Sequence, residues 1–242
     1  MLEDKAALHY MGDAGRRYHE GKRAISAKAF PWVAKLRAEK IAPYVALTDA
    51  VFEFGVGFGW NLAQLRCAKR LGCDVSTFLA PALQPHGIDF VSEMTAVATD
   101  SIDVAISHHS LEHVLHPARS LLDLRRVIRP GGKLLLFVPY EKERRYHSYH
   151  RNEPNHHLYS WNVQTLGNLV EENGFDVQEA RLGRFGYDRF AANWATRFNV
   201  GNAGFRLIRG AVHLIKPAYE VRIVAIKKNE PRFGLQNEPG AT

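Results

Sequence analysis

A glycine-rich turn directly after a short apolar run is the feature that most constrains the fold. The turn is Glu53-Phe-Gly-Val-Gly-Phe-Gly59, and the apolar run that leads into it covers residues 50–53. Glycines at alternate positions let a backbone turn sharply and come close to a ligand. We expect a helix to begin near Trp60-Asn61, where free N–H groups and the helix dipole would favour a negatively charged ligand group. The pattern predicts a strand, a ligand-binding turn and a helix, although a purely structural βα turn has the same composition.

The chain after this turn alternates between short apolar runs and helical patterns. Such alternation is typical of β-α-β units arranged around a parallel sheet. The segment Arg129-Pro-Gly-Gly-Lys133 is predicted as a turn, because proline fixes φ and glycine permits positive φ. The predicted helices are residues 60–65, 77–84, 116–127 and 163–173. The predicted strands are residues 50–53, 69–73, 88–91, 104–107, 133–138, 176–182 and 221–227.

Two further segments are predicted as helical additions to this core. Residues 1–45 are mostly polar with apolar positions at helical spacing, which indicates a covering layer. Within residues 188–217, apolar and basic residues alternate at helical spacing over residues 205–215, as in an amphipathic helix. Core packing is the favoured role of this helix, and contact with a membrane surface or a lipid-linked substrate is the alternative. We predict one domain over residues 1–228 and a mobile tail over residues 229–242.

Composition and charge limit the class of protein. The 242 residues are 46% hydrophobic and 24% charged, which excludes a disordered chain and a small disulfide-stapled one. Cys67 and Cys73 are too few for a disulfide framework or a Cys-only zinc site. No segment has the apolar length of a signal peptide core or a membrane span, so we expect a cytoplasmic protein. The net charge of +7 admits nucleic acid, an anionic membrane surface or an acidic small molecule as partner.

The glycine pattern differs from the dinucleotide fingerprint. That fingerprint is G-x-G-x-x-G, whereas this chain has G-x-G-x-G and no further glycine directly after Gly59. Asp74 lies at the end of the second predicted strand, 21 positions after Glu53, where a carboxylate can accept both hydroxyl protons of a ribose. Asp74 can also cap the helix that follows it. The spacing indicates a ribose-containing ligand and weakens a nicotinamide assignment.

Four motifs stand in a fixed order at residues 53–59, 72–76, 101–114 and 127–139. Together they resemble the class I S-adenosylmethionine-dependent methyltransferases, and specifically the small-molecule type with an L-E-H-V motif. The resemblance implies an α/β, Rossmann-like fold with a seven-stranded, mostly parallel sheet, helices on both faces and a reversed final strand. It also implies methyl transfer from S-adenosylmethionine to an oxygen or nitrogen of a small acceptor.

The resemblance assigns the methionine and ribose parts of the cofactor to the first two motifs. Gly55, Gly57 and Gly59 would lie under the methionine part. Glu53 would reach the ammonium group of the cofactor directly or through water, and Asp74 would hold the ribose.

The resemblance assigns the adenine and the sulfonium to the next two strands. Val75, Glu93 and Met94 would lie against the adenine, although Ser92-Glu93-Met94 departs from the Asp-containing adenine motif that is usual in the family. Ser107 and His108 would line the sulfonium side.

A metal site is suggested by one string but is not assigned. His109-Ser-Leu-Glu-His113 has the H-x-x-E-H pattern of inverted zinc proteases. Such a site needs a third ligand downstream, and the string lies inside the L-E-H motif of the methyltransferases, so we predict no metal. A divalent ion on His109, Glu112 and His113 that orients a hydroxyl acceptor stays open, and His109 is one of two candidate catalytic residues.

The second candidate catalytic residue is His157. Residues 140–161 follow the fifth strand and would lie over the carboxyl edge of the sheet, where open α/β sheets bind ligands. Basic side chains there could hold an anionic or glycan acceptor, and His157 could remove its proton. The alternative is a solvated polar loop. We expect His157 to be a better base than His113, which should pack against the sheet.

The predicted acceptor is a small molecule, with a saccharide or surface-glycan precursor as the first hypothesis. Because alignment with a sulfonium can carry methyl transfer, a base is needed only where the acceptor atom is protonated. An RNA methyltransferase is one alternative, but no proline-aromatic loop follows the fourth strand, so nucleic acid is disfavoured as a partner. A non-catalytic cofactor-binding protein is the other alternative. The sequence does not indicate an oligomeric state.

Overall fold

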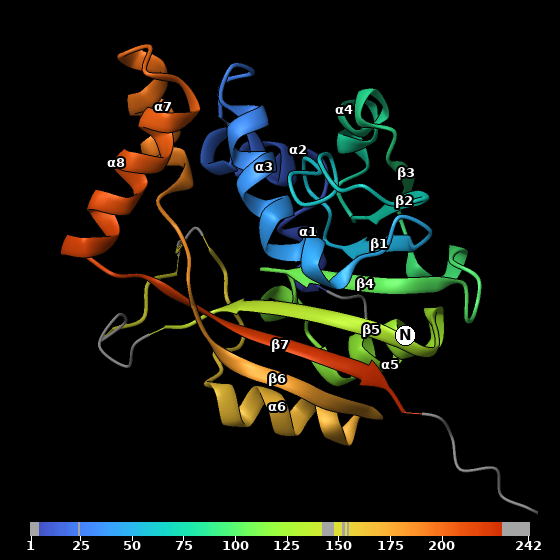
Figure 1. Cartoon of the computed structure of the whole chain (residues 1–242). Helices are drawn as coiled ribbons and strands as arrows, with labels where there is room; N and C mark the ends of the chain where they lie inside the picture. Colours follow the sequence, from blue (N-terminus) through green and yellow to red (C-terminus); the bar gives the residue numbers. More distant parts are fainter. Residues whose placement is uncertain (1–4, 24, 142–147, 152, 154, 229–242) are drawn as a thin grey trace, which may run out of the picture.

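The computed structural model describes residues 5–23, 25–141, 148–151, 153 and 155–228, which form a seven-stranded sheet with helices on both faces (Figure 1). The strand order is β3-β2-β1-β4-β5-β7-β6, and β7 runs antiparallel to both of its neighbours. The predicted α/β, Rossmann-like fold and all seven predicted strands are confirmed. The strands are β1 (Ala50–Phe54), β2 (Lys69–Cys73), β3 (Asp89–Val91), β4 (Ile102–His108), β5 (Ile128–Pro139), β6 (Phe175–Arg184) and β7 (Tyr219–Lys227).

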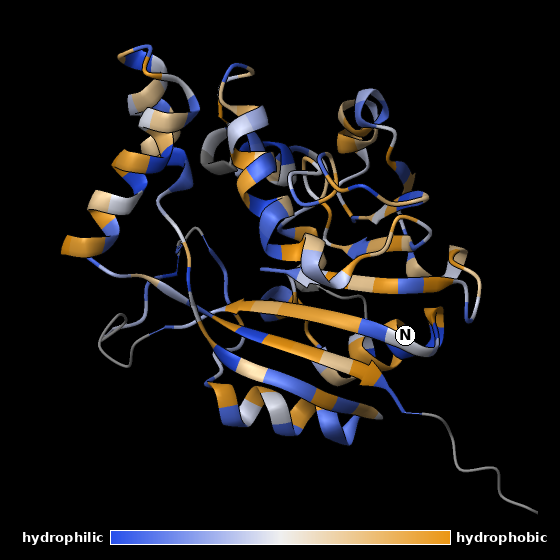
Figure 2. Ribbon diagram, in the orientation of Figure 1, coloured by the Kyte–Doolittle hydropathy of each residue, from blue (hydrophilic) through white to orange (hydrophobic). Residues whose placement is uncertain are grey.

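The central strands are apolar on both faces because the sheet is covered on both sides. In β5, Leu134 and Leu136 belong to one buried cluster, while Leu135 and Phe137 belong to another. Successive strand residues point to opposite faces of a sheet, so this alternation divides the core into two layers. The ribbon coloured by hydropathy shows the same two-sided apolar character along β5 and β7 (Figure 2).

Different helices cover the two faces. Helices α5 (Pro117–Val127) and α6 (Val163–Glu172) bury their apolar stripes in the cluster that contains Leu134. Helices α3 (Phe30–Ile41) and α4 (Ala80–Leu83) contribute to the cluster that contains Leu135. The remaining short helices are α1 (Lys5–Leu8), α2 (Gly12–Tyr18), η1 (His19–Arg23), η2 (Ala42–Tyr44), η3 (Thr77–Leu79), η4 (Gln84–His86), η5 (Met94–Ala96) and η6 (Leu111–His113).

The helix predicted over residues 60–65 is wrong. The backbone there forms turns, in which the N–H groups of Leu62 and Ala63 both donate to the carbonyl of Gly59. The sheet face left open by the missing helix is covered by α3, whose Ile41 packs in the same cluster as Leu62.

The turn predicted at residues 129–133 is also wrong, because the segment is part of β5. Its pairing with β4 is irregular between Ile102 and Val104, and Gly131 has a φ of +73°. The positive φ that the two glycines were expected to permit is therefore used at Gly131, within an irregular part of the strand.

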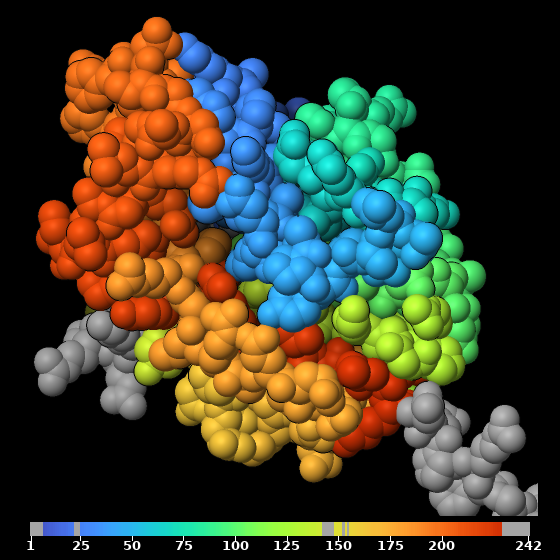
Figure 3. Space-filling view, in the orientation of Figure 1, coloured from blue at the N-terminus to red at the C-terminus, as the bar shows by residue number. Residues whose placement is uncertain are grey.

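The predicted helical insertion before the last strand is two helices, α7 (Asp188–Arg197) and α8 (Gly201–Ile215), which lie beside α3 (Figure 3). Core packing is confirmed for Phe205, which is fully buried against α3 and α7, but Ile215 is 87% exposed. No helix in the described residues is long and apolar enough to cross a membrane. The single domain over residues 1–228 stays a prediction, and the tail at 229–242 lies outside the described residues.

The N-terminal cover should contribute to stability as a core element does. Replacement of the fully buried Ile41 by Ala should lower the free energy of unfolding by about 2–5 kcal/mol, because the side chain leaves a cavity over the sheet. Leu207→Ala on α8 is the matched control, since Leu207 is 75% exposed and should cost little. Denaturant unfolding of the two variants measures both values. Equal small losses would show that α3 is not part of the core.

Candidate active site

A cavity of about 310 Å³ opens at the carboxyl edge of the sheet. The turn after β1 and the ends of β2 and β4 form its floor, and the N-terminal helices form one wall. Its lining residues are Ala7, Tyr10, Tyr18, His19, Arg37, Phe54, Gly55, Val56, Gly57, Phe58, Trp60, Asn61, Cys73, Asp74, Val75, Ser92, Met94, His108, His109, Ser110, His113 and Val114.

The glycine turn has the geometry that the sequence predicts. Gly55, Gly57 and Gly59 have φ values of +76°, +52° and +73°, a region that other residues enter only with strain. The close approach is plainest at Gly55, where an added Cβ would lie 2.0 Å from the Ser110 Oγ. Gly55 and Gly57 line the cavity, whereas Gly59 packs away from it against Leu83 and Ile88.

Asp74 connects the glycine turn to the next loop. One carboxylate oxygen accepts a hydrogen bond from the Gly57 N–H and the other accepts one from the Ser76 N–H, each at 2.9 Å. The local bond to Ser76 resembles the capping role that the sequence left open. Because each carboxylate oxygen has two acceptor sites, both can still accept from a ligand hydroxyl in the cavity.

Glu53 is fully buried and does not line the cavity. Its burial raises the pKa to about 8, although the hydrogen bond from the Asn61 side-chain amide and the charge of Arg37 oppose this rise. Asn61 does line the cavity. Within the described residues, the Glu53 Oε2 and the Asn61 Oδ1 are buried acceptors with no hydrogen-bond partner. An ammonium group at this end of the cavity would satisfy such acceptors.

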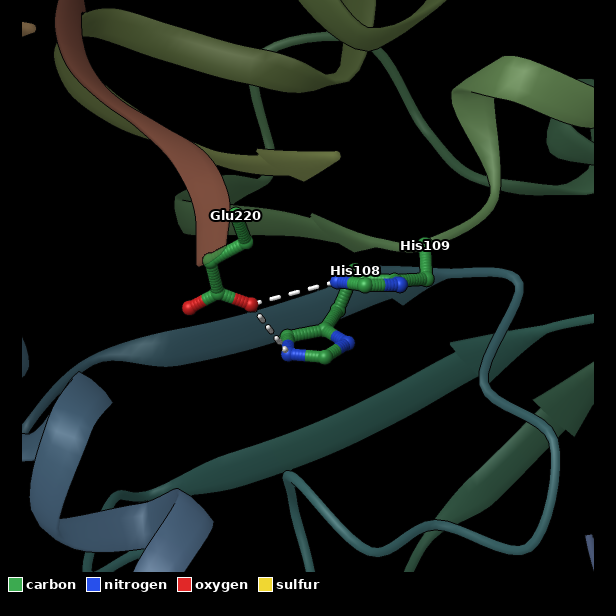
Figure 4. Close-up of side chains that lie close together, drawn as sticks. All are labelled: His108, His109 and Glu220. Carbon is green, nitrogen blue, oxygen red and sulfur yellow. Dashed lines mark hydrogen bonds and ion pairs between the residues drawn. The ribbon is translucent and has the colours of Figure 1, made fainter. Parts of the chain in front are cut away.

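The carboxylate of Glu220 lies beside the rings of His108 and His109 (Figure 4). Its Oε2 lies 3.2 Å from the His109 Nε2 and 3.6 Å from the His108 Nε2, and both rings line the cavity. Its Oε1 lies 2.8 Å from the Lys40 Nζ and 2.8 Å from the Arg222 Nε. Burial alone would raise the pKa of Glu220, but the Lys40 charge and the His109 hydrogen bond outweigh it and lower the pKa to about 2. Glu220 is therefore a carboxylate at neutral pH.

The Lys40 ammonium lies within a group of three side chains that could otherwise bind a metal ion. His108, His109 and Glu220 each offer an atom close enough to share one ion. The Lys40 ammonium, however, lies 2.7 Å from the His108 Nε2 and 2.8 Å from Glu220. Burial lowers the pKa of Lys40 to about 8. Near neutral pH the cation in this cluster is therefore the lysine.

The H-x-x-E-H string does not form a helical metal site. His109 has a φ of +55°, and only Leu111–His113 form a single 3₁₀ turn, so His109 and His113 do not share a helix face. Glu112, His113 and His157 do lie close together. This second group joins two different segments of the chain and is not the arrangement that the string suggested.

The positions of His113 and His157 are the reverse of those expected from the sequence. His113 lines the cavity instead of packing only against the sheet, and its Nδ1 lies 2.7 Å from the Tyr10 hydroxyl. His157 stands behind it, with 4.9 Å between the two ring centroids, and lies outside the lining of the cavity. The His157 Nδ1 is 3.0 Å from the Glu141 carboxylate.

Seven of the twelve candidate site residues line the cavity. The five that do not are Glu53, Gly59, Glu93, Ser107 and His157. The sequence reasoning missed Tyr10, His19, Arg37, Lys40, Asn61 and Glu220. For Glu220 a signal existed: a reversed last strand begins at the edge where the parallel strands end, and Glu220 is opposite Pro139 in the register.

The buried Glu53 should make stability depend on pH. Its pKa is raised from 4.5 to about 8 by folding, so the folded state binds its proton more tightly than the unfolded state. The free energy of unfolding should therefore fall as pH rises between these values, by up to about 1.4 kcal/mol per pH unit. Glu53→Gln should flatten this slope, and the exposed Glu172→Gln should leave it unchanged. Identical slopes in wild type and Glu53→Gln would show that Glu53 is ionised in the folded chain.

Comparisons with known proteins identify the family and the fold of this chain. Residues 23–180 match the family described as methyltransferase domain. No curated protein matches the chain significantly. Among solved structures, a Burkholderia thailandensis 1,6-didemethyltoxoflavin-N1-methyltransferase with bound S-adenosylhomocysteine is similar, with 18% identity, 93% of this chain and 88% of that chain covered, and a TM-score of 0.58. A Thermotoga maritima protein described as a possible histamine N-methyltransferase has 16% identity, coverage of 88% and 97%, and a TM-score of 0.60.

The fold alone does not fix the reaction. The [4+2]-cyclase SpnF has the same fold, with 17% identity, coverage of 81% and 80%, and a TM-score of 0.55. The family match is more specific, because it spans most of the chain and includes the glycine turn, Asp74 and the histidines after β4. The chain belongs to the methyltransferase-domain family and is a class I S-adenosylmethionine-dependent methyltransferase.

Proposed function

We propose that this enzyme transfers the methyl group of S-adenosylmethionine to a nitrogen or oxygen of a polar small molecule bound beside His109. One observation supports this assignment most strongly: the glycine turn and Asp74 line the same cavity as His108, His109 and His113. A cofactor and an acceptor can therefore share one enclosed space, as direct methyl transfer requires.

The part of the cavity lined by the glycine turn and Asp74 fits the cofactor. Asp74 would accept hydrogen bonds from the ribose hydroxyls while it keeps its bonds to the backbone of the turn. Val75 and Met94 offer an apolar wall for the adenine. The unpartnered acceptors on Asn61 and Glu53 would meet the ammonium group, with Asn61 at the cavity wall and Glu53 behind it.

The part lined by the three histidines would position the acceptor and take up its proton. S-adenosylmethionine supplies a methyl group on a sulfonium, which is a good leaving group. The Glu220 carboxylate lies 3.2 Å from the His109 Nε2, whereas the Glu112 Oε1 lies 3.9 Å from the His109 Nδ1. The shorter contact favours a proton on Nε2, so the neutral ring carries its lone pair on Nδ1. In this proposal His109 accepts the proton of the acceptor at Nδ1, and Glu220 fixes the tautomer.

His157 has a supporting role in this proposal. It stands one ring behind His113, and its contact with Glu141 holds it there. We therefore assign the base to His109 rather than to His157, and we assign His157 to the positioning of His113. A protonated amine or hydroxyl acceptor needs such a base, whereas an acceptor with a free lone pair needs only alignment.

The class and charge of the acceptor, and where the enzyme meets it, are the finer part of this proposal. The saccharide or surface-glycan precursor stays a prediction, and the net positive charge supports an anionic acceptor. Exposed Leu207, Leu214 and Ile215 on α8, next to Lys216, support peripheral membrane contact. The cytoplasmic location also stays a prediction.

Cofactor binding tests the first half of the proposal. Asp74→Asn should weaken the affinity for S-adenosylhomocysteine by roughly 5- to 100-fold, because a charge-assisted bond to the ribose is lost. Asp123→Asn on α5 is the matched control and should bind as wild type does. Calorimetry of both variants, with NAD as a second ligand that should not bind, measures the effect. Equal affinities in all three proteins would remove Asp74 from the cofactor site.

Methyl transfer tests the second half. Labelled S-adenosylmethionine and a panel of amines and alcohols, each in neutral, phosphorylated and carboxylated forms, identify an acceptor. With that acceptor, His109→Ala should lower kcat by about 10²–10⁴-fold at unchanged S-adenosylhomocysteine affinity. The exposed His116→Ala should have no effect, and His157→Ala should have a smaller one. A large loss in His157→Ala with normal turnover in His109→Ala would reverse the assignment.

A further inference from the structure

A second cavity, of about 130 Å³, lies on the other side of Arg37 from the active site. It is lined by residues of α3, β6, α7, α8 and β7 and by Phe185, which lies between β6 and α7. Five of its eight lining residues are cationic at neutral pH, and the volume is enough for several water molecules. The lining residues are Leu36, Arg37, Lys40, Arg184, Phe185, Asp188, Arg209 and Arg222.

The positive charges around this cavity exceed the negative ones. Asp188 accepts hydrogen bonds from Arg37 at 3.1 Å and from Arg209 at 2.8 Å. Glu220 is likewise shared by Lys40 and Arg222, at 2.8 Å each. Each of these two carboxylates is thus shared by two cations.

Arg184 is the fifth cation at this cavity. Its carbonyl accepts a bond from Arg222, and no ion pair of its guanidinium occurs within the described residues. Counted over this part of the chain, the cavity is left with an excess of three positive charges.

Burial makes the excess of positive charge costly for the four cations other than Arg184. The side chains of Arg37, Lys40, Arg209 and Arg222 are only 8%, 12%, 18% and 18% exposed. Cations removed from water need opposite charges nearby, and the like charges of Arg37 and Arg222 contribute to the lowered pKa of Lys40. The Arg37 Nε is buried and has no hydrogen-bond partner in the described structure. An anion in the cavity would offset this repulsion.

The cavity adjoins the acceptor half of the active site. Arg37 lines both cavities. The Lys40 Nζ lies 2.7 Å from the His108 Nε2, and the ring centroid of Phe185 is 4.1 Å from that of His109. The wall between the two spaces is therefore made of side chains, which can move without a change in the fold.

We propose that this second cavity is an anion subsite that holds the phosphate or carboxylate group of the acceptor while its nucleophilic atom lies beside His109. This proposal rests on the proposed function. Arginine guanidinium groups bind both kinds of oxyanion through paired N–H bonds, and here Arg184 and Arg209 reach the cavity from two different elements. The excess charge and the position next to His109 together select an anionic acceptor.

The experiment uses inorganic phosphate as the probe and Arg184→Gln as the variant. Arg184 is exposed and has no ion pair in the described residues, so the variant should fold. Phosphate titrated into the full chain at constant ionic strength should bind wild type, and Arg184→Gln should bind it about tenfold more weakly. Arg119→Gln is the matched control, because Arg119 is 74% exposed on α5 and lines neither cavity. Equal phosphate affinity in both variants, or none in wild type, would overturn the anion subsite.

Turnover distinguishes the two sources of the oxyanion. If the subsite holds the acceptor, phosphate should compete with the phosphorylated or carboxylated members of the panel and raise their KM, and Arg184→Gln should raise the same KM about tenfold at unchanged kcat. If phosphate binds but leaves the KM of every acceptor unchanged, the cavity takes a free anion and the acceptor assignment is wrong. S-adenosylhomocysteine affinity is measured in parallel, since its absence in wild type would overturn the proposed function without touching the phosphate result.

Discussion

The fully buried carboxylate of Glu220 is the group on which the geometry of the acceptor side depends. A carboxylate out of contact with water must be paired, and removal of one partner leaves an uncompensated charge. Its partners come from three places: Lys40 from the N-terminal cover, His109 from the end of β4 and Arg222 from its own strand. This one charge therefore fixes the distance between the N-terminal helix, the catalytic edge of the sheet and the reversed strand.

The N-terminal cover has two roles: it covers part of the sheet and it supplies side chains to the cavities. The residues between Gly59 and Lys69 form no helix, and α3 packs over that part of the sheet with Ala38 and Ile41. The same helix carries Arg37 and Lys40, three residues apart, toward the active site and the cationic cavity. Short helices before α3 add Tyr10 and His19 to the wall of the cofactor cavity. A segment outside the sheet therefore forms part of the cavity wall.

The fold could be predicted well from local patterns. Alternation such as that of Leu134 to Val138, and the turn at Gly55 and Gly57, depend on neighbouring residues and are visible in the sequence. The helix at residues 60–65 was predicted because the composition there suits a helix, whereas the backbone forms turns. The cofactor end of the site follows a local motif, so Asp74 and the glycines were found.

The acceptor end could not be predicted in the same way. Lys40 and Arg37 read as solvent-facing charges of an amphipathic helix, and Glu220 reads as a polar residue at the start of a strand. Only the antiparallel pairing of β5 with β7 places Glu220 opposite Pro139, at the edge where β4 delivers His109. The expected positions of His113 and His157 were wrong for the same reason, since local patterns do not show contacts between distant segments. The loop that holds His157 contacts Tyr10 and His113, which come from segments far apart in the sequence.

The role of His109 as the base depends on one atomic detail, which is the position of the proton on its neutral ring. Nitrogen-15 NMR of the imidazole groups measures this tautomer directly, with His109→Gln to assign the signals and Glu220→Gln to remove the partner. A proton on Nε2 in wild type, with mixed tautomers in Glu220→Gln, is the predicted result. A proton on Nδ1 in wild type would contradict the account, because the atom that faces Glu220 would then be the acceptor of a hydrogen bond that a carboxylate cannot donate.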